Sequence, residues 1–263
     1  MDRTCDGGRR AVVLGAAATA LAPAAWASSV PPLVAAASDL QFALPEVASA
    51  FRRRTGTEVR LVFGSSGSFV QQIRSGAPFE VFLSADEAYV DNLRAAGHTA
   101  DDGRLYAVGR IGIFTPRRSP VRADERMDDL AAALRDGRLR KLAIANPAHA
   151  PYGRAARVAL TRRGLWAAVQ PKLVLGDNAS QATQFAVSGS AQAGIIPLSL
   201  AAAPTVAQAG RFALVPEGWH SPLRQRAVVL RGAGAGARGF FDFLQGAEAR
   251  RILARHGFRL PAP

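Results

Sequence analysis

The feature of this sequence that most constrains its fold is an alternation of short apolar runs with helix-length segments. Several of the runs are rich in β-branched residues, which is typical of buried strands. They lie at 33–37, 59–63, 81–83, 107–114, 142–145, 194–196 and 227–230. Strands that alternate with helices predict an α/β architecture, with mostly parallel sheets flanked by helices on both faces.

The helical pattern is clearest between residues 40 and 51. Apolar side chains recur there with a period near 3.6, at positions 40, 43, 44, 47, 48 and 51. Pro45 interrupts the pattern, because a proline inside a helix removes one hydrogen bond and crowds the carbonyl four residues back. We therefore expect either a kink at Pro45 or a helix that begins nearer Phe42.

The first 27 residues have the features of an export signal. An Arg-Arg pair at positions 9 and 10 precedes an apolar run over 11–21, and Ala-Trp-Ala at 25–27 supplies a small-x-small cleavage pattern. The arginine pair leaves the twin-arginine and general secretory routes both open. Cys5 precedes the apolar run and is the one cysteine of the chain, so cleavage would leave no disulfide. We expect an exported protein with a signal peptide at 1–27.

The chain is strongly basic, with 33 Lys and Arg residues against 20 Asp and Glu residues. Nearly all of the cations are arginines, scattered singly or in short groups. A nucleic-acid-binding protein would gather such charge on one helix or stripe, together with aromatic residues or a recognisable docking motif. The sequence shows neither, so it predicts a basic solvated surface and no nucleic-acid partner. A hydrophobic content of 49% argues against a disordered chain.

Small polar residues follow four of the predicted strands, where helices are expected to begin. In an open α/β sheet, ligands bind at the carboxyl ends of strands, where helix N-termini present unpaired N–H groups and partial positive charge. Four such junctions around one cleft would form an anion site without a fixed cation. Ser, Asn and Gly are also ordinary cap and turn residues, so a purely structural role stays open. The junctions are Ala-Ala-Ser-Asp at 36–39, Gly-Ser-Ser-Gly-Ser at 64–68, Asn-Pro-Ala-His-Ala-Pro-Tyr-Gly at 146–153 and Asp-Asn-Ala-Ser at 177–180.

Two of these junctions fit helix-capping patterns, Ser38 with Gln41 and Asn178 with Gln181. None contains the Gly-Lys-Ser/Thr of a P-loop or a dinucleotide-binding fingerprint. The four histidines, at positions 98, 149, 220 and 256, lack metal-ligand spacing, and the serines of 64–68 lack the Gly-x-Ser-x-Gly nucleophile elbow. We expect no enzyme activity and no cofactor, with a Ser/His hydrolase that uses His149 as the less favoured alternative.

Taken in order, the junctions and their flanks resemble the periplasmic molybdate-binding proteins of ABC importers. The resemblance covers nearly the whole chain after residue 27. It depends on an ordered set of short motifs and not on any one of them. The motifs are Ala-Ala-Ala-Ser-Asp-Leu (35–40), Phe-Gly-Ser-Ser-Gly (63–67), Gly-Ala-Pro-Phe-Glu-Val-Phe-Leu-Ser-Ala-Asp (76–86), Leu-Ala-Ile-Ala-Asn-Pro (142–147), Pro-Tyr-Gly (151–153), Gly-Leu-Trp (164–166) and Pro-Lys-Leu-Val (171–174).

The resemblance implies the two-lobed periplasmic-binding-protein fold of type II, with the ligand in the cleft between two α/β lobes. Crossover strands join the lobes, so the first lobe is discontinuous. We place the first lobe at 28–111 and 217–263 and the second at 112–216. Segments 109–114 and 227–230 are expected near the hinge.

The resemblance also implies a site for a tetrahedral dianion, molybdate or tungstate, held by hydroxyl and N–H donors from both lobes. Carried over by position, the binding residues are Ser38, Asp39, Ser66, Tyr152 and the N–H of Ala179. All of these except Asp39 are expected to bind molybdenum as its oxyanion and not as a bare cation. Neutral donors suit such anions, which present only acceptors at neutral pH.

Two residues depart from the family pattern. Asp39 stands where the family commonly has a hydroxyl or an amide, and a carboxylate beside a dianion is repulsive unless it points away or is protonated. We expect Asp39 to turn outward and donate only its N–H; otherwise it accepts a hydrogen bond from a protonated oxyanion or another solute. Pro197 replaces a tyrosine that bonds the anion in one branch of the family, and Tyr152 is expected to supply the missing hydroxyl or its own N–H.

The resemblance therefore implies a monomeric solute-binding protein that captures molybdate or tungstate and delivers it to an ABC permease of the inner membrane. A binding protein for sulfate, phosphate or another solute is the alternative that Asp39 and Pro197 raise.

Overall fold

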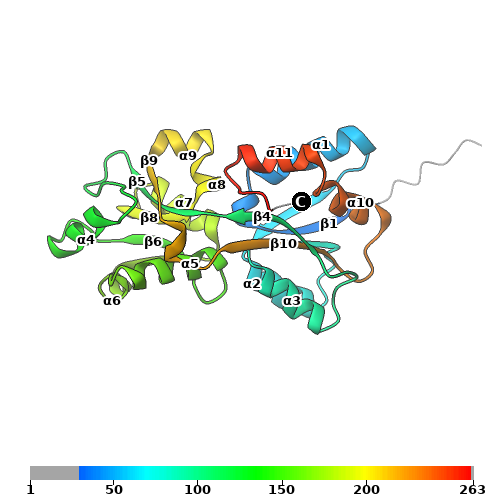
Figure 1. The fold of residues 1–263 in the computed structure, drawn as a ribbon, viewed down its shortest axis with the longest axis horizontal. Helices are drawn as coiled ribbons and strands as arrows, with labels where there is room; N and C mark the ends of the chain where they lie inside the picture. Colours follow the sequence, from blue (N-terminus) through cyan, green and yellow to red (C-terminus); the bar gives the residue numbers. More distant parts are fainter. Residues whose placement is uncertain (1–29, 262–263) are drawn as a thin grey trace, which may run out of the picture. The chain divides into compact units, whose positions relative to one another are not determined.

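The computed structural model describes residues 30–261, and the predicted signal peptide at 1–27 lies outside them. From Pro31 onward these residues belong to one compact unit that contains two five-stranded sheets (Figure 1). The first sheet has the order β2-β1-β3-β10-β4, with β1 (Leu33–Ala37), β2 (Arg60–Gly64), β3 (Val81–Ser84), β4 (Arg104–Gly109) and β10 (Leu223–Val229). The second has the order β7-β6-β8-β5-β9, with β5 (Ile111–Pro116), β6 (Leu142–Ala145), β7 (Leu173–Gly176), β8 (Ala193–Pro197) and β9 (Gly210–Leu214).

In each sheet four strands run the same way and one runs against them. Strand β10 is antiparallel to both of its neighbours, β3 and β4, and β5 is antiparallel to both β8 and β9. The remaining neighbours pair in parallel. This arrangement confirms the predicted two-lobed α/β fold with mostly parallel sheets. In each sheet, the antiparallel strand is the first strand that the chain forms after it crosses from the other lobe.

Helices cover both faces of the first sheet (Figure 1). One face carries α1 (Ala43–Thr55), α10 (Ala235–Phe243) and α11 (Ala247–Arg255), and its core includes Phe51, Phe240 and Leu253. The other carries α2 (Ser66–Arg74) and α3 (Glu87–Ala95) over Phe69 and Phe82. Helix α1 begins one residue after Phe42, as predicted. Pro45 therefore lies in the first turn, where its missing N–H would have had no helical acceptor.

The second sheet is covered in the same way. Its helices are α4 (Asp128–Arg135), α5 (Pro151–Arg162), α6 (Trp166–Val169), α7 (Ala179–Val187), α8 (Leu198–Ala201) and α9 (Pro204–Ala209). Leu130 of α4 and Leu160 of α5 belong to one core, and Val206 of α9 belongs to the core that contains Ile196. Three single turns, η1 (Ser38–Leu40), η2 (Gln170–Lys172) and η3 (Glu217–Trp219), complete the described elements.

The chain passes between the two sheets twice. Strand β4 ends at Gly109 and β5 begins at Ile111, so the run predicted as a single strand at 107–114 is two strands separated by Arg110. The chain returns between the end of β9 and the start of β10. The predicted hinge segment at 227–230 lies mostly within β10, where Ala227–Val229 pair with β3.

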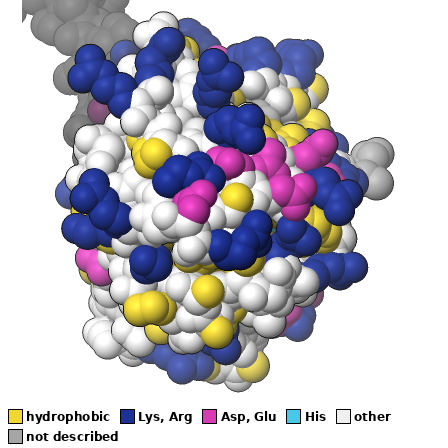
Figure 2. Space-filling view, turned by 90° about the vertical axis from the view of Figure 1, so that its left-hand side faces the viewer, with side chains coloured by type: hydrophobic (Ala, Val, Ile, Leu, Met, Phe, Trp, Pro, Cys, Tyr) yellow, Lys and Arg dark blue, Asp and Glu magenta, His cyan; other side chains and the backbone are white. Residues whose placement is uncertain are grey.

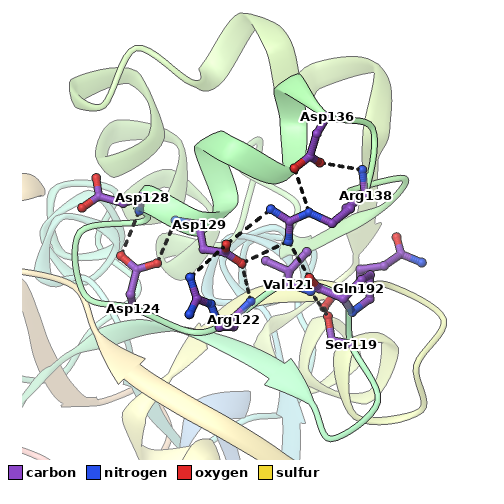
Figure 3. Close-up of polar contacts among 10 residues, drawn as sticks. Ser119, Val121, Arg122, Asp124, Asp128, Asp129, Asp136, Arg138 and Gln192 are labelled. Atoms are coloured by element: carbon purple, nitrogen blue, oxygen red, sulfur yellow. Dashed lines mark hydrogen bonds and ion pairs between the residues drawn. The ribbon is translucent and has the colours of Figure 1, made fainter.

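The outer end of the second lobe shows how the basic surface is organised. Lys and Arg side chains surround a smaller group of Asp and Glu side chains on this face (Figure 2). Asp129 accepts the N–H of Arg122 at 2.7 Å and the guanidinium of Arg138 at 3.3 Å (Figure 3). Burial disfavours the Asp129 carboxylate, but these two hydrogen bonds and the charges of the two arginines together outweigh that effect and lower the pKa of Asp129. Part of the excess arginine charge is thus neutralised locally.

Candidate anion-binding site

The four polar junctions converge on one small cavity between the lobes. Its volume is about 10 Å³, and all five residues predicted to bind the anion line it. The first lobe contributes η1 and the start of α2, and the second contributes the starts of α5 and α7. The lining residues are Ala37, Ser38, Asp39, Gly64, Ser65, Ser66, Ala85, Ala150, Pro151, Tyr152 and Ala179.

Local sequence fixes the helix starts that face this cavity. The Ser65 hydroxyl caps α2 by accepting the N–H of Ser68 at 3.3 Å. The side-chain oxygen of Asn178, Oδ1, caps α7 by accepting the N–H of Gln181 at 3.0 Å. Pro151 occupies the first position of α5, where no N–H is needed. The cap predicted at Asn178 is confirmed.

The capping box predicted for Ser38 and Gln41 is wrong. No side chain of the described residues caps η1, and the hydroxyl of Ser38 instead accepts the N–H of Ser180 from the other lobe at 3.2 Å. Gln41 likewise accepts a hydrogen bond from the Ser180 hydroxyl. A partner in the second lobe has replaced the local cap.

Two serine hydroxyls are oriented to donate. Ser38 Oγ accepts from Ser180, and Ser66 Oγ accepts the N–H of Ala85 at 3.0 Å. Both hydroxyls line the cavity and are buried, and neither donates to another described residue. Their protons are therefore available to an acceptor placed between the lobes.

Backbone N–H groups add a second set of donors. Within residues 30–261, the N–H groups of Asp39, Ser66, Tyr152 and Ala179 have no backbone acceptor. Three of them belong to the first turns of α2, α5 and α7, where N–H groups lack intrahelical partners and the helix dipole favours negative charge. Both lobes therefore present N–H donors to the cavity.

The Asp39 side chain does not turn outward, contrary to expectation. It is 1% exposed, and its Oδ2 accepts the Tyr152 hydroxyl at 2.8 Å and the Gln225 amide at 2.6 Å. Burial raises the pKa of Asp39 from 3.8 to about 6, although the bonds from Gln225 and Tyr152, and after them its own backbone N–H, favour the charged form. Removal from water makes the carboxylate costly here, since no ion pair compensates among its described neighbours.

Tyr152 lies at the cavity, but its hydroxyl proton is used within the protein. Because that hydroxyl donates to Asp39, only the N–H of Tyr152 is left as a donor to a ligand. Burial, followed by the nearby Asp39, raises the pKa of Tyr152 well above its ordinary value, so the phenol stays neutral. Pro197 ends β8 outside the set of lining residues. Ser199, two residues later, donates to the Asp39 carbonyl at 2.8 Å.

Two buried residues of this network were missed from the sequence. Gln225 in β10 donates to Asp39, and Tyr106 in β4 donates to the Gln225 carbonyl oxygen at 2.7 Å. Gln225 is 0% exposed and occupies an inward position of a strand whose flanking arginines are not buried. A polar side chain at an inward position of such a strand was the available signal.

Contacts from the loop that contains His149 and from α5 join the two lobes at the rim of the cavity. The His149 carbonyl, in the second lobe, accepts the N–H of Gly67 at 3.0 Å and the Tyr89 hydroxyl at 3.1 Å. His149 Nδ1 lies 2.8 Å from Ser65 Oγ. Arg154 of α5 adds bonds to Tyr89 and Asp86, both at 2.6 Å.

Other kinds of site find no support in the described part of the chain. There, no group of three or more His, Cys, Asp and Glu residues is placed to hold a metal ion. No helix between residues 30 and 261 is long and apolar enough to cross a membrane.

Comparisons with known proteins agree with this geometry. The family of bacterial extracellular solute-binding proteins matches residues 32–259. The molybdate-binding protein ModA of Azotobacter vinelandii is 36% identical over 255 residues, which cover 96% of this chain and 97% of that protein. ModA of Rhodobacter capsulatus is 34% identical over 229 residues, which cover 86% and 87% of the two chains.

Solved structures show the same relationship. The periplasmic molybdate-binding protein of Azotobacter vinelandii superposes with a TM-score of 0.78 at 29% identity, over 88% of this chain and 100% of that one. The sulfate-binding protein SubI of Mycobacterium tuberculosis reaches 0.73 at 19% identity, over 89% and 87%, which shows a shared fold alone. These matches extend over nearly all of the described residues, and the chain belongs to the bacterial extracellular solute-binding proteins, as a relative of ModA.

Proposed function

We propose that this protein captures molybdate or tungstate outside the cytoplasm and delivers the anion to an ABC permease. In this proposal it is exported by a signal peptide at 1–27 and acts as a monomer in the periplasm. Its first lobe comprises 28–111 and 217–263, and its second lobe comprises 112–216. The curated relatives named molybdate-binding protein support the choice of anion.

The observation that carries the proposal is the set of donors around the cavity. Ser38 and Ser66 supply hydroxyl protons, and Asp39, Ser66, Tyr152 and Ala179 supply N–H groups. A fully ionised tetrahedral anion offers only acceptors, so a cage of neutral donors matches it. Neither lobe holds the whole set, and the ligand would have to bridge them.

The size of the cavity implies a conformational step. A volume of about 10 Å³ is near the minimum that holds one water molecule. A tetrahedral oxyanion is larger than a water molecule and does not fit into this cavity. We propose that the lobes part to admit the anion and then close on it, with the segment around Arg110 among the residues that bend. The bound anion stabilises the closed arrangement because only that arrangement uses donors from both lobes.

The Ser/His pair at the rim does not favour a hydrolase. Ser65 already accepts the N–H of Ser68 as a helix cap, and His149 Nε2 has no hydrogen-bond partner among the described residues to orient it as a base. We propose that this pair connects the lobes, and that the protein is neither an enzyme nor dependent on a cofactor.

Calorimetric titration of the purified protein with molybdate, tungstate, sulfate, phosphate and chromate, at fixed pH and salt, tests the proposal. We expect tight binding of molybdate and tungstate, strong weakening in Ser66→Ala, and no change in Ser221→Ala, whose side chain is exposed. Binding of sulfate or phosphate instead would support the assignment of the anion site but change the anion that the protein is proposed to carry. No response to any of these anions would reject the site.

A further inference from the structure

The two oxygens of the Asp39 carboxyl group have different surroundings. Oδ2 is engaged by two donors, Tyr152 and Gln225. Oδ1 is buried and has no hydrogen-bond partner among the described residues. Because Asp39 lines the anion cavity, Oδ1 is the carboxyl oxygen left for a ligand.

The donors on Oδ2 are fixed by their own neighbours. The Tyr106 hydroxyl donates to Gln225 Oε1 at 2.7 Å, which leaves the Gln225 Nε2 protons directed at Asp39 and at the Tyr152 oxygen. Tyr152 then has its own proton free for Oδ2. A proton on a neutral Asp39 would therefore be carried by Oδ1.

Among the described residues, no positively charged side chain faces this carboxyl group from the elements packed around it. The titratable groups that face Asp39 are the phenols of Tyr152 in α5 and Tyr106 in β4, and burial raises the pKa of both well above their ordinary values. Ser180 of α7 and Ser199 of α8 are neutral and bond the backbone of η1. A carboxylate and a dianion would thus meet in a buried space without a compensating cation.

We infer that Asp39 binds the anion as a neutral carboxylic acid, donating the Oδ1 proton to an anion oxygen while Oδ2 remains bonded to Tyr152 and Gln225. The inference rests on the proposed function and makes Asp39 a donor that selects for acceptor-only anions. The proton comes from solvent when Asp39 is ionised in the free protein, so capture of one dianion takes up as much as one proton.

This coupling has a defined pH dependence. Burial brings the pKa of Asp39 to about 6, so the fraction of free protein ready to bind falls as the pH rises above that value. The apparent Kd then increases about tenfold for each pH unit, because only the protonated fraction binds. Below pH 6 the dependence on Asp39 fades.

The decisive experiment is calorimetric titration with molybdate at pH 6.5, 7.5 and 8.5, in pairs of buffers with different heats of ionisation. For the wild type we expect uptake of about one proton per anion at the two higher pH values and a Kd that rises about a hundredfold across the series. Asp39→Asn keeps one acceptor and one donor group but does not ionise, so its Kd should stay nearly constant and no proton should be taken up. His149 and the anion itself are the same in both titrations.

The outcomes separate the two proposals. Wild-type binding without proton uptake, or the same pH slope in Asp39→Asn, overturns the inference and leaves the anion site standing. Molybdate binding that weakens on acidification would point to an ionised Asp39 in the complex, which also overturns it. Failure of both proteins to bind any oxyanion rejects the proposed function itself.

A second variant covers the case in which Asp39→Asn does not fold. Tyr152→Phe removes a hydrogen bond that favours the charged form of Asp39 but keeps the backbone N–H that faces the cavity. The pKa of Asp39 should rise, and tight binding should extend to higher pH. A shift in the opposite direction, or no shift, contradicts the inference.

Discussion

The two lobes build their sides of the cavity from different chemistry. The first lobe supplies two serine hydroxyls and the carboxyl group of Asp39, in addition to N–H groups. The second lobe supplies N–H groups at the starts of α5 and α7. Tyr152, its one polar side chain among the described residues that line the cavity, bonds Asp39. Substituting a side chain can therefore remove donors of the first lobe directly. The N–H donors of the second lobe can be changed only by altering the position of its backbone.

The largest effect on anion affinity is expected from a substitution that prevents the second lobe from closing against the first. A Cβ on Gly67 would lie 2.6 Å from the His149 carbonyl oxygen and 2.8 Å from the Tyr89 hydroxyl oxygen. Gly67→Ala should hinder closure and lower anion affinity about a hundredfold or more, because two or more hydrogen bonds to a charged ligand are lost. Titration calorimetry measures the affinity, and X-ray scattering measures the separation of the lobes.

The control for this variant is Gly239→Ala. A Cβ there would meet Phe51 at 3.7 Å, an ordinary contact, and the added methyl group favours the helix. Its affinity should equal that of the wild type. Equal affinity in Gly67→Ala as well would show that closure does not need the His149 contact.

Asp39 of the first lobe bonds Tyr152 of the second, and its burial should affect the free energy of unfolding. Its raised pKa stabilises the folded protein below pH 4, and this contribution is lost as the pH rises from about 4 to about 6. Asp39→Asn removes the buried charge, so at pH 8 its free energy of unfolding should exceed that of the wild type by about 1–3 kcal/mol. Urea unfolding at pH 8 and pH 4 measures the difference, which should nearly vanish at pH 4. A less stable Asp39→Asn at pH 8 would mean that the charged form is favoured in the fold.

The variants Ser38→Ala and Ser66→Ala test the hydroxyl donors of the first lobe. Each removes one hydroxyl donor to a charged ligand, worth about 1.5–3 kcal/mol, so affinity should fall about tenfold to a hundredfold. Ser38→Ala also leaves the N–H of Ser180 without its acceptor, and Ser66→Ala does the same to the N–H of Ala85, so a lower melting temperature should accompany each. Unchanged affinity in both variants would remove the hydroxyls from the site.

The smallest effect is expected at His149, although it lies at the rim. His149→Ala removes the contact with Ser65 but keeps the carbonyl that Gly67 and Tyr89 bond. Affinity should change by no more than about threefold, in line with the loss of one part-buried polar contact that does not touch the ligand. Complete loss of function in this variant would revive the hydrolase alternative.

The sequence predicts much of the site because helix starts have local patterns. Asn178 and Gln181 share one turn, so their relation depends little on the rest of the fold. Ser38 and Gln41 have the same spacing, yet both bond Ser180, because a contact from the other lobe replaced the local one. The spacing of residues along the chain does not show which residue of the other lobe will lie beside them.

The environment of Asp39 was not predictable for a related reason. Its partners Tyr152 and Gln225 are 113 and 186 residues away along the chain. Only the fold brings β10 and α5 to the end of β1. The sequence indicated that a carboxylate was out of place in an anion site, and the structure shows what surrounds it.

The double passage of the chain has a consequence for modular exchange. Gly109 and Leu223 are paired neighbours in the first sheet, and Gly112 and Leu214 are paired neighbours in the second. The second lobe is therefore one continuous insertion whose two ends emerge side by side. We expect that such a segment could be exchanged between relatives as a unit. It would carry the N–H donors of α5 and α7, while the hydroxyls of Ser38 and Ser66 would remain in the first lobe.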